Sequence, residues 1–207
     1  MLIFNQLDTK KTSFSKSFDA YLLERNKVSG EVSQLVSEII LKIRSKGDNA
    51  LKDLTKEFDG FDPDVFKISN EEINQILKSC DKDIIKSLEY SFKKILDYQS
   101  RCFTSLNLKD IDNEITRKFR VIQSVGIYVP GGKASYPSTV LMGTAPAIAC
   151  GVNEISMTSP AQNGILNPLT IAAAKVAGIE TIYKIGGAQA IAALALGTDQ
   201  ISKVDKI

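Results

Sequence analysis

Residues 125–152 read VGIYVPGGKASYPSTVLMGTAPAIACGV, and this stretch decides the fold. Its apolar start, 125–129, predicts a buried strand that ends at a proline and two glycines. The small apolar residues that follow predict a helix that begins at Ser138, bends at Pro146 and ends at Gly151. A strand, a glycine-containing turn and a helix in this order are typical of the opening of a nucleotide-binding domain.

The same pattern continues downstream. Asn167 and Pro168 predict the start of a second helix and Gly178 its end, and a third helix follows Gly186 and ends at Gly197. The predicted strands follow one another at spacings of about 25 to 30 residues, which are those of βαβ units in a parallel sheet. The fold class is therefore α/β, a Rossmann-like parallel sheet with flanking helices. The further strands are predicted at 154–158, 181–185 and 203–207.

The first hundred residues predict helices instead. A helix is predicted through EVSQLVSEIILKIRSKG, with Gly47 as its stop, and a second one capped by Asp48 ends at Asp59 and Gly60. Both contain apolar residues, and in the first helix these fall at helical spacing, which predicts one buried face. These residues are Val32, Leu35, Val36, Ile39, Ile40 and Ile43 in the first helix, and Leu51, Leu54 and Phe58 in the second.

Two further helix starts complete this region. Ser69 and Glu72 have the spacing of a capping box, with Ser69 reaching forward and Glu72 reaching back, and Asp81 is predicted to start a longer helix. The alternating stretch NEITRKFRVIQS, 113–124, predicts a half-exposed strand or hairpin. We therefore divide the chain into a helical N-terminal region, 1–104, and an incomplete Rossmann-like α/β nucleotide-binding domain, 105–207.

Candidate binding residues lie at the predicted carboxyl ends of the strands, where parallel sheets bind ligands and helix N-termini present unpaired N–H groups. These ends read YVPGG, TSP and GGAQ. Their glycines let a ligand approach the backbone, Tyr128 offers a ring face and a hydroxyl, and Gln189 offers an amide for a ribose or adenine edge. A single glycine pair is more often just a tight turn, but three such ends favour ligand binding. The pattern is not GxGxxG, and no acidic residue ends the second strand, so the usual dinucleotide fingerprint is absent.

No catalytic or metal-binding residue is predicted in this chain. Cys150 lies at a predicted helix C-terminus, where the dipole disfavours a thiolate, so a packed cysteine is favoured over a nucleophile. The chain contains no histidine, the usual base at neutral pH and a frequent zinc ligand. Four carboxylates lie near helix ends, where caps and solvated side chains outnumber acid/base pairs: Asp62, Asp64, Glu71 and Glu72.

Composition narrows the class of protein. With 26 basic and 24 acidic residues the net charge is +2, so neither nucleic acid nor a membrane surface is an expected partner. Cys80, Cys102 and Cys150 are odd in number and have apolar neighbours, which predicts reduced, buried thiols. The start MLIFNQLDTKK lacks a signal-peptide pattern and no stretch has membrane-spanning length, so we expect a cytoplasmic protein.

The segments GIYVPGGKASYPSTVLMGTAPAIACGVNEI and NPLTIAAAKVAGIETIYKIGGAQAIAALALGT, with the closing VDKI, resemble histidinol dehydrogenase. Weaker agreement extends through RSKGDNALKDLTKEFDG, so the resemblance covers most of the chain. It implies an NAD-dependent, zinc-containing, homodimeric oxidoreductase that converts L-histidinol through L-histidinal to L-histidine. It also implies that Tyr128 and Gln189 contact NAD.

In that family the zinc ligands, the Glu-His acid/base pair, most substrate contacts and a GPGN cofactor segment follow the part that this chain resembles. The resemblance therefore implies an N-terminal portion of the enzyme, and we expect this chain alone to lack turnover. One alternative is a non-catalytic nucleotide-binding or assembly module that supports another chain. The other is a nonfunctional remnant, whose uncovered apolar surface would make the isolated chain aggregate.

Overall fold

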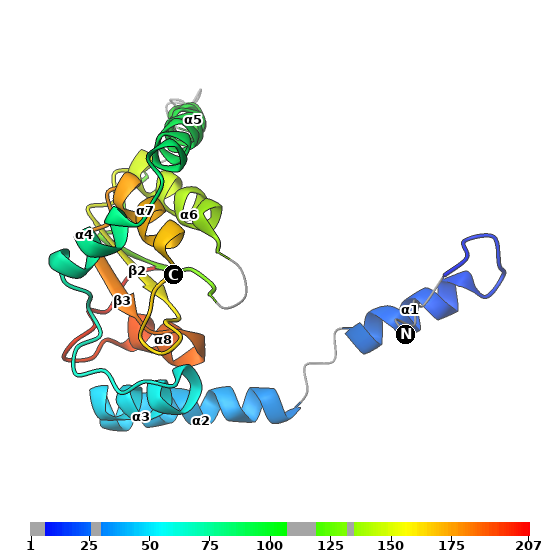
Figure 1. Ribbon diagram of the computed structural model, residues 1–207. Helices are drawn as coiled ribbons and strands as arrows, with labels where there is room; N and C mark the ends of the chain where they lie inside the picture. The colour runs from blue at the N-terminus through cyan, green and yellow to red at the C-terminus, as the bar shows by residue number, and fades with distance from the viewer. Residues whose placement is uncertain (1–6, 26–29, 107–118, 132–134) are drawn as a thin grey trace, which may run out of the picture. The chain divides into compact units, whose positions relative to one another are not determined.

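The computed structural model describes residues 7–25, 30–106, 119–131 and 135–207 (Figure 1). Contacts between residues divide the chain into two compact units, 1–38 and 39–207. In the first unit, helix α1 (Phe14–Arg25) carries two stacked rings, Phe14 and Phe18, whose centroids are 5.6 Å apart. The second unit contains the sheet and the helices packed on it. The boundary at residue 104, drawn from the character of the sequence, remains a prediction.

Three parallel strands form the sheet in the order β1 (Ser124–Tyr128), β2 (Glu154–Ser159), β3 (Thr181–Lys184). Helices α6 (Pro137–Ala149) and α7 (Pro168–Val176) connect consecutive strands, and α8 (Gly187–Leu196) follows β3. The α/β fold is confirmed, and each of these strands ends within one residue of its predicted bounds.

The fourth predicted strand, 203–207, is present only as one isolated bridge beside β1. Lys206 pairs in parallel with Val125, and its carbonyl accepts the Gly126 N–H at 2.9 Å. The chain therefore steps from β1 to β3 in one direction and returns past β1 by way of α8. In open α/β sheets this reversal creates a ligand crevice at the carboxyl ends of the two strands beside it. The topology thus marks the end of β1 as a place for a ligand.

Four more helices precede the sheet, and their existence agrees with the sequence. The buried face predicted for the first of them is only partly present, because Ile39 and Ile43 are buried whereas Val32 and Leu35 are about half exposed. On the next helix Phe58 is likewise exposed. The helices are α2 (Gly30–Lys46), α3 (Asp48–Asp59), α4 (Asn70–Lys78) and α5 (Lys82–Leu106).

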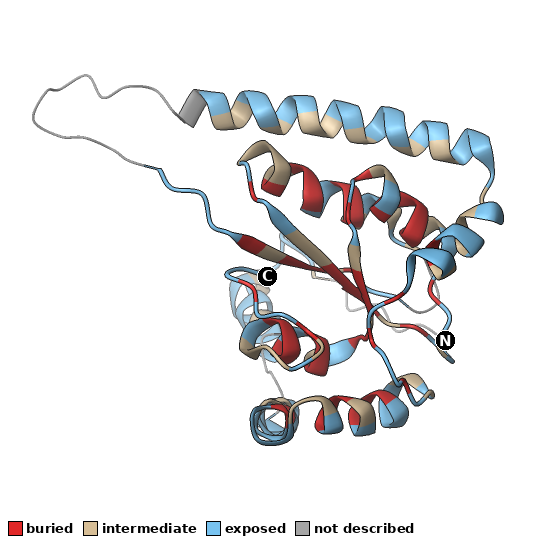
Figure 2. Ribbon diagram, turned by 90° about the vertical axis from the view of Figure 1, so that its left-hand side faces the viewer, coloured by how far each residue is buried: buried red, intermediate tan, exposed pale blue. Residues whose placement is uncertain are grey.

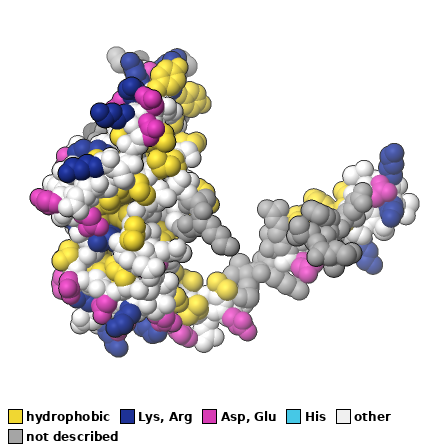
Figure 3. All heavy atoms as spheres, in the orientation of Figure 1, with side chains coloured by type: hydrophobic (Ala, Val, Ile, Leu, Met, Phe, Trp, Pro, Cys, Tyr) yellow, Lys and Arg dark blue, Asp and Glu magenta, His cyan; other side chains and the backbone are white. Residues whose placement is uncertain are grey.

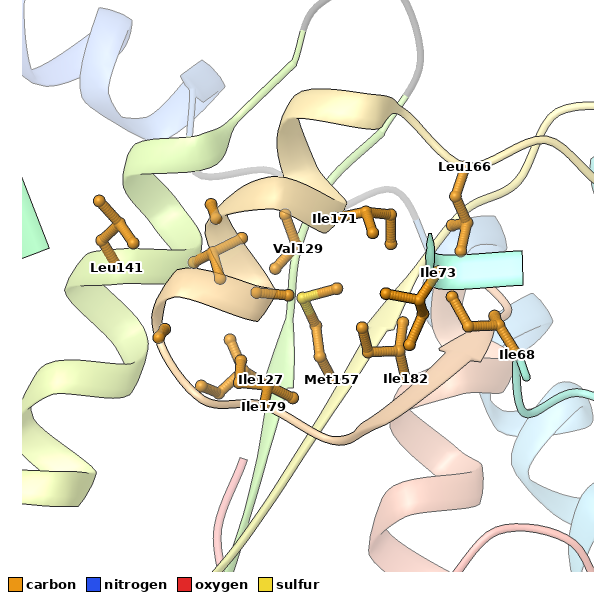
Figure 4. Packing of buried hydrophobic residues seen from close by; sticks show 14 of the residues in the cluster. Ile68, Ile73, Ile127, Val129, Leu141, Met157, Leu166, Ile171, Ile179 and Ile182 are labelled. Carbon is orange, nitrogen blue, oxygen red and sulfur yellow. The ribbon is translucent and has the colours of Figure 1, made fainter. Parts of the chain in front are cut away.

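A hydrophobic cluster lies on each face of the sheet (Figure 2). On one face Met157 of β2 is fully buried among isoleucines and other apolar side chains of the strands, α4 and α7, as Figure 4 shows, and α5 covers α6 and α7. On the other face Tyr183 of β3 and Leu194 of α8 pack against α3 and the end of α2. Fully buried alanines, such as Ala173 and Ala193, let α7 and α8 approach the sheet closely.

Two helix starts differ in detail from prediction. The N-cap of α3 is Gly47 rather than Asp48, whose carboxylate instead accepts the Gln200 N–H at 3.1 Å. The N-cap of α6 is Tyr136 rather than Ser138, because Pro137 fits the first helical position, where its missing N–H is not needed. Asp81 does start α5 as predicted, since it accepts the Asp83 N–H at 2.7 Å.

Only one of the two hydrogen bonds predicted for the capping box at α4 is present. Ser69 accepts the Glu72 N–H at 3.1 Å, but the Glu72 carboxylate pairs with Lys184 of β3, at 3.1 Å, instead of reaching back. This ion pair is partly shielded from water, with side chains 18% and 34% exposed, so it is stronger than a solvated one. Glu71 interacts with the helix start in another way, since hydrogen bonds from its own backbone N–H and from the Ser69 side chain lower the pKa of its carboxyl.

The structure tests only part of the predicted hairpin and corrects the predicted burial of the three thiols. Half of the stretch predicted as a strand or hairpin, 113–118, lies outside the described residues, and residues 119–123 form no strand. Cys80, Cys102 and Cys150 form no disulfide, as predicted, but all three are partly exposed rather than buried. Cys150 is accessible because it is the C-cap of α6, beyond the last packed turn.

Candidate functional site

The candidate site lies at the carboxyl ends of the three strands, where two glycines and a proline crowd together. A Cβ on Gly186 would lie 2.6 Å from Cβ of Pro160 and 3.0 Å from its Cα, and a Cβ on Gly131 would lie 3.1 Å from the Pro160 carbonyl oxygen. A proline ring cannot move aside, so glycine is required for the strand ends to converge. The glycines predicted to line the site therefore have a packing role that brings its parts together.

Tyr128 connects the end of β1 to the start of α8. Its hydroxyl accepts the backbone N–H of Gly187 at 3.1 Å, although 59 residues separate the two. The ring is partly buried and packs against the hydrophobic cluster on the α8 face. An accepting hydroxyl can still donate its own proton, so Tyr128 can bind a ligand oxygen while it holds the helix start in place.

Gln189 lies in the first turn of α8 and is only 1% exposed. Its amide folds over Gly187, where an added Cβ would lie 2.5 Å from Oε1 and 3.1 Å from Nε2. Gly187 has φ +65°, a conformation that only glycine adopts readily. The Gln189 Nε2 group is buried and has no hydrogen-bond partner among the described residues. A buried donor without a partner costs about 1–3 kcal/mol, which a ligand acceptor would offset.

Thr158 adds a second unpartnered polar atom beside Tyr128. The two residues are register partners on β1 and β2, so their side chains project from the same face of the sheet. Thr158 is fully buried, and its Oγ1 has no partner within the described part of the chain. We call Tyr128, Thr158, Gly186, Gly187 and Gln189 the carboxyl-edge site.

Asp59 also reaches this edge, where no sequence motif predicted it. It is the last residue of α3, and the Gly186 N–H interacts with its carboxylate. Burial raises the pKa of the Asp59 carboxyl, an effect that the Gly186 N–H opposes. A contact between residues so far apart in sequence has no local signal; only the packing of α3 against α8 produces it.

The other residues weighed in the sequence lie elsewhere. Cys150 is at the far end of α6 from its start near the strand ends, so it takes no part in the carboxyl-edge site. Asp62 pairs with Lys56 and Asp64 with Lys52 in exposed ion pairs, as expected for solvated carboxylates. Glu72 differs because its partner, Lys184, is partly buried. None of these four residues is brought to the site.

A hollow lies on the α6 side of β1. It has a volume of about 940 Å³, and its lining is mostly apolar. Several of the large side chains around it are exposed, Met142 of α6 by 63%. We call it the apolar groove; its lining includes Phe119, Val121, Ile122, Ile127, Met142 and Ile207.

Three general properties bear on function. Across the described residues, no group of three or more His, Cys, Asp or Glu side chains is arranged to hold a metal ion. No helix in the described ranges is both long and apolar enough to span a membrane. On the face shown in Figure 3, acidic and basic side chains are interspersed.

Comparison with known proteins identifies the family of the chain. A family model described as histidinol dehydrogenase matches residues 23–207. The histidinol dehydrogenase of Methanococcus maripaludis is 46% identical over 191 residues, which are 90% of this chain and 45% of that protein. That of Agrobacterium fabrum is 40% identical over 205 residues, 97% of this chain and 48% of that protein.

A solved structure agrees with these sequence matches. The crystal structure of histidinol dehydrogenase from Elizabethkingia anophelis superposes with a TM-score of 0.76 at 30% identity, covering 87% of this chain and 42% of that one. The chain thus spans about half the length of the curated relatives that it matches.

Proposed function

The chain belongs to the histidinol dehydrogenase family, and from that premise we propose that its carboxyl-edge site binds NAD for the oxidation of L-histidinol through L-histidinal to L-histidine. One observation carries the proposal: the buried Gln189 amide, which has no partner among the described residues, at the N-terminus of α8. An unpaired donor there, beside backbone N–H groups and the positive end of a helix dipole, suits the oxygen-rich phosphate and ribose groups of a dinucleotide.

The residues of the site divide the work of holding NAD. Gly186 and Gly187 carry no side chain that would block a ligand from the backbone at the start of α8, and Tyr128 fixes that start through its bond to the Gly187 N–H. The Gln189 amide donates a hydrogen bond to the ligand, and Thr158 offers a hydroxyl on the same face of the sheet as Tyr128. When bound, NAD accepts hydride from the carbon being oxidised. Because these residues hold NAD through polar groups in fixed positions, the site needs a rigid turn and few charged side chains.

The family also implies zinc, and the described residues of this chain do not fit it. They offer no cluster of ligands that could hold a metal ion, and the chain has no histidine. We therefore assign no metal-dependent step to this chain. We propose that the residues that hold zinc, move protons and bind histidinol belong to the part of the family enzyme that this chain does not cover, and that the complete enzyme is a cytoplasmic homodimer.

Calorimetric titration of NAD into the purified chain tests the proposal. We expect saturable binding that Tyr128→Ala and Gln189→Ala each weaken by about tenfold or more, since each loses a contact worth about 1–2 kcal/mol. Tyr90→Ala is the matched control, because Tyr90 is an exposed tyrosine on α5. Failure of the folded chain to bind NAD, or equal effects of all three changes, would contradict the proposal.

An assay of histidinol oxidation tests the assignment of the chemistry. We expect no NADH formation by the 207-residue chain with histidinol and NAD, because it contains no acid/base residue of the family pattern. A mixture with a polypeptide that carries the uncovered half of a relative is the positive control. Turnover by the chain alone would refute this assignment.

The apolar groove favours a second candidate function, an assembly module that supports another chain. Exposed apolar surface of this size on one face is typical of a protein contact. The relatives have about as much chain again beyond the matched part, so the occupant we propose is a polypeptide equivalent to that second half. Co-purification of the two polypeptides as a stable 1:1 complex, lost in Met142→Lys, would support this function; no complex at micromolar concentration would contradict it.

A further inference from the structure

We infer that Asp59 is the carboxylate that binds the ribose hydroxyls of the dinucleotide and favours NAD over NADP. The inference rests on the proposed function and extends it to a residue outside the strand ends. Dinucleotide sites of the common kind use an acidic residue at the end of the second strand for this purpose. Here that strand ends in Ser159 and Pro160, so the carboxylate must come from another element.

The position of Asp59 meets that need. It ends α3, which packs against α8, and the Gly186 N–H at the β3–α8 turn interacts with its side chain. Its own carbonyl accepts the Asn163 N–H at 3.1 Å, which ties the end of α3 to the loop after β2. The carboxylate is thereby held at the edge that also carries Gly187 and the buried Gln189 amide.

The carboxylate has an unused acceptor. Asp59 Oδ2 is buried, and no described residue donates a hydrogen bond to it. An acceptor of this kind binds a donor, which a ribose diol supplies and a phosphate does not. A 2′-phosphate in place of the hydroxyl would bring two negative groups together, so the same oxygen rejects NADP.

Asp59 is also a poor choice for stability alone. A negative charge in the last turn of a helix opposes the helix dipole, and burial without a cationic partner disfavours the charged form. The neighbouring carboxylates avoid these costs, since Asp62 and Asp64 are exposed and paired with lysines. The Gly186 N–H offsets part of this cost, but Asp59 Oδ2 stays without a donor among the described residues, and a residue that breaks local rules in this way is a candidate functional position.

The test measures cofactor preference and stability together. The isosteric variant Asp59→Asn is compared with the unchanged chain and with Asp62→Asn, a control on an exposed carboxylate nearby. NAD and NADP are titrated into each by calorimetry, and the melting temperature of each is recorded. In the unchanged chain and the control we expect NAD to bind at least tenfold more tightly than NADP.

For Asp59→Asn we expect NAD binding to weaken by about tenfold, the NAD to NADP ratio to fall by at least tenfold, and the melting temperature to stay equal or rise. A purely structural Asp59 would lower the melting temperature and weaken both cofactors alike, and that result would overturn the inference. An unchanged ratio with NAD binding intact would overturn it as well while leaving the proposed function standing. Absence of NAD binding by the unchanged chain would overturn both.

Discussion

The two sides of β1 have opposite chemistry. On the α8 side, Gly126 and Tyr128 face a tightly packed helix, and a Cβ on Gly126 would lie 2.8 Å from Leu194. On the α6 side, Ile127 lies against Gly143 and borders the apolar groove. The first side offers a few buried polar atoms in fixed positions, and the second offers broad apolar area. Fixed polar groups recognise a small molecule, whereas apolar area suits a second polypeptide.

The largest effect should come from filling the crowded strand ends. Gly186→Ala adds a Cβ that overlaps the rigid Pro160 ring, so we expect a loss of about 1–3 kcal/mol of stability and no measurable NAD binding. Denaturant unfolding and calorimetry measure the two effects. Gly30→Ala is the control, because a Cβ there meets nothing within 4 Å. Normal NAD binding by Gly186→Ala would show that the strand ends are not the site.

Two glutamines separate a ligand-binding amide from a structural one. In Gln200 both groups are used, since Oε1 accepts the Phe66 N–H at 3.0 Å and Nε2 donates to the Asp64 carbonyl at 3.2 Å. We expect Gln200→Leu to destabilise the fold by about 1–3 kcal/mol and to leave NAD affinity unchanged. We expect Gln189→Leu to leave stability unchanged or higher and to weaken NAD by about tenfold or more. The reverse pattern would remove the main support for the carboxyl-edge site.

A charge in the apolar groove should act on association alone. Met142 is 63% exposed, so Met142→Lys loses little packing, and we expect less than about 0.5 kcal/mol of change in stability. We expect the variant to bind NAD normally and to self-associate less than the unchanged chain in sedimentation velocity. If Met142→Lys lowered NAD affinity as much as it lowers self-association, the two sides of β1 would not act separately.

The smallest effect is a pH dependence at the amino end of β1. Asp205 accepts the N–H groups of Ser124, at 3.0 Å, and Gln123, at 2.9 Å, and these bonds lower its pKa from the ordinary 3.8. A lowered folded-state pKa stabilises the fold above pH 3.8, and this gain is lost as the pH falls through the folded value. Asp205→Asn should therefore lower the melting temperature at pH 7, with a difference that shrinks toward pH 2. A constant difference across this range would contradict the account.

Much of the fold follows from local sequence, because strands and helix ends depend on neighbours along the chain. The strand at Val125, the cap at Asn167 and the stop at Gly178 were all predictable in this way. The wrong predictions at Asp48 and Glu72 have long-range causes. Asp48 accepts a hydrogen bond from Gln200 and Glu72 pairs with Lys184, and neither partner can be found by counting residues along a helix.

In the candidate site, too, some features have a local sequence signal and others depend on long-range packing. Tyr128 and Gln189 were predictable because parallel strands place their carboxyl ends at one edge. The bond from Gly187 to Tyr128 and the approach of Asp59 to Gly186 were not, since both depend on how α8 and α3 pack. The apolar groove was expected only in general terms, as surface left uncovered, and its lining on α6 required the structure.

Nuclear magnetic resonance can show residue by residue whether NAD binds on the α8 side of β1 at the strand ends. The ¹⁵N-labelled chain would be titrated with NAD while the backbone signals of Gly186 and Gly187 and the side-chain amide of Gln189 are followed. We expect saturable shifts of these three signals and none at Met142 and Gly143 in the apolar groove. Shifts in the groove with none at the three signals would contradict this expectation.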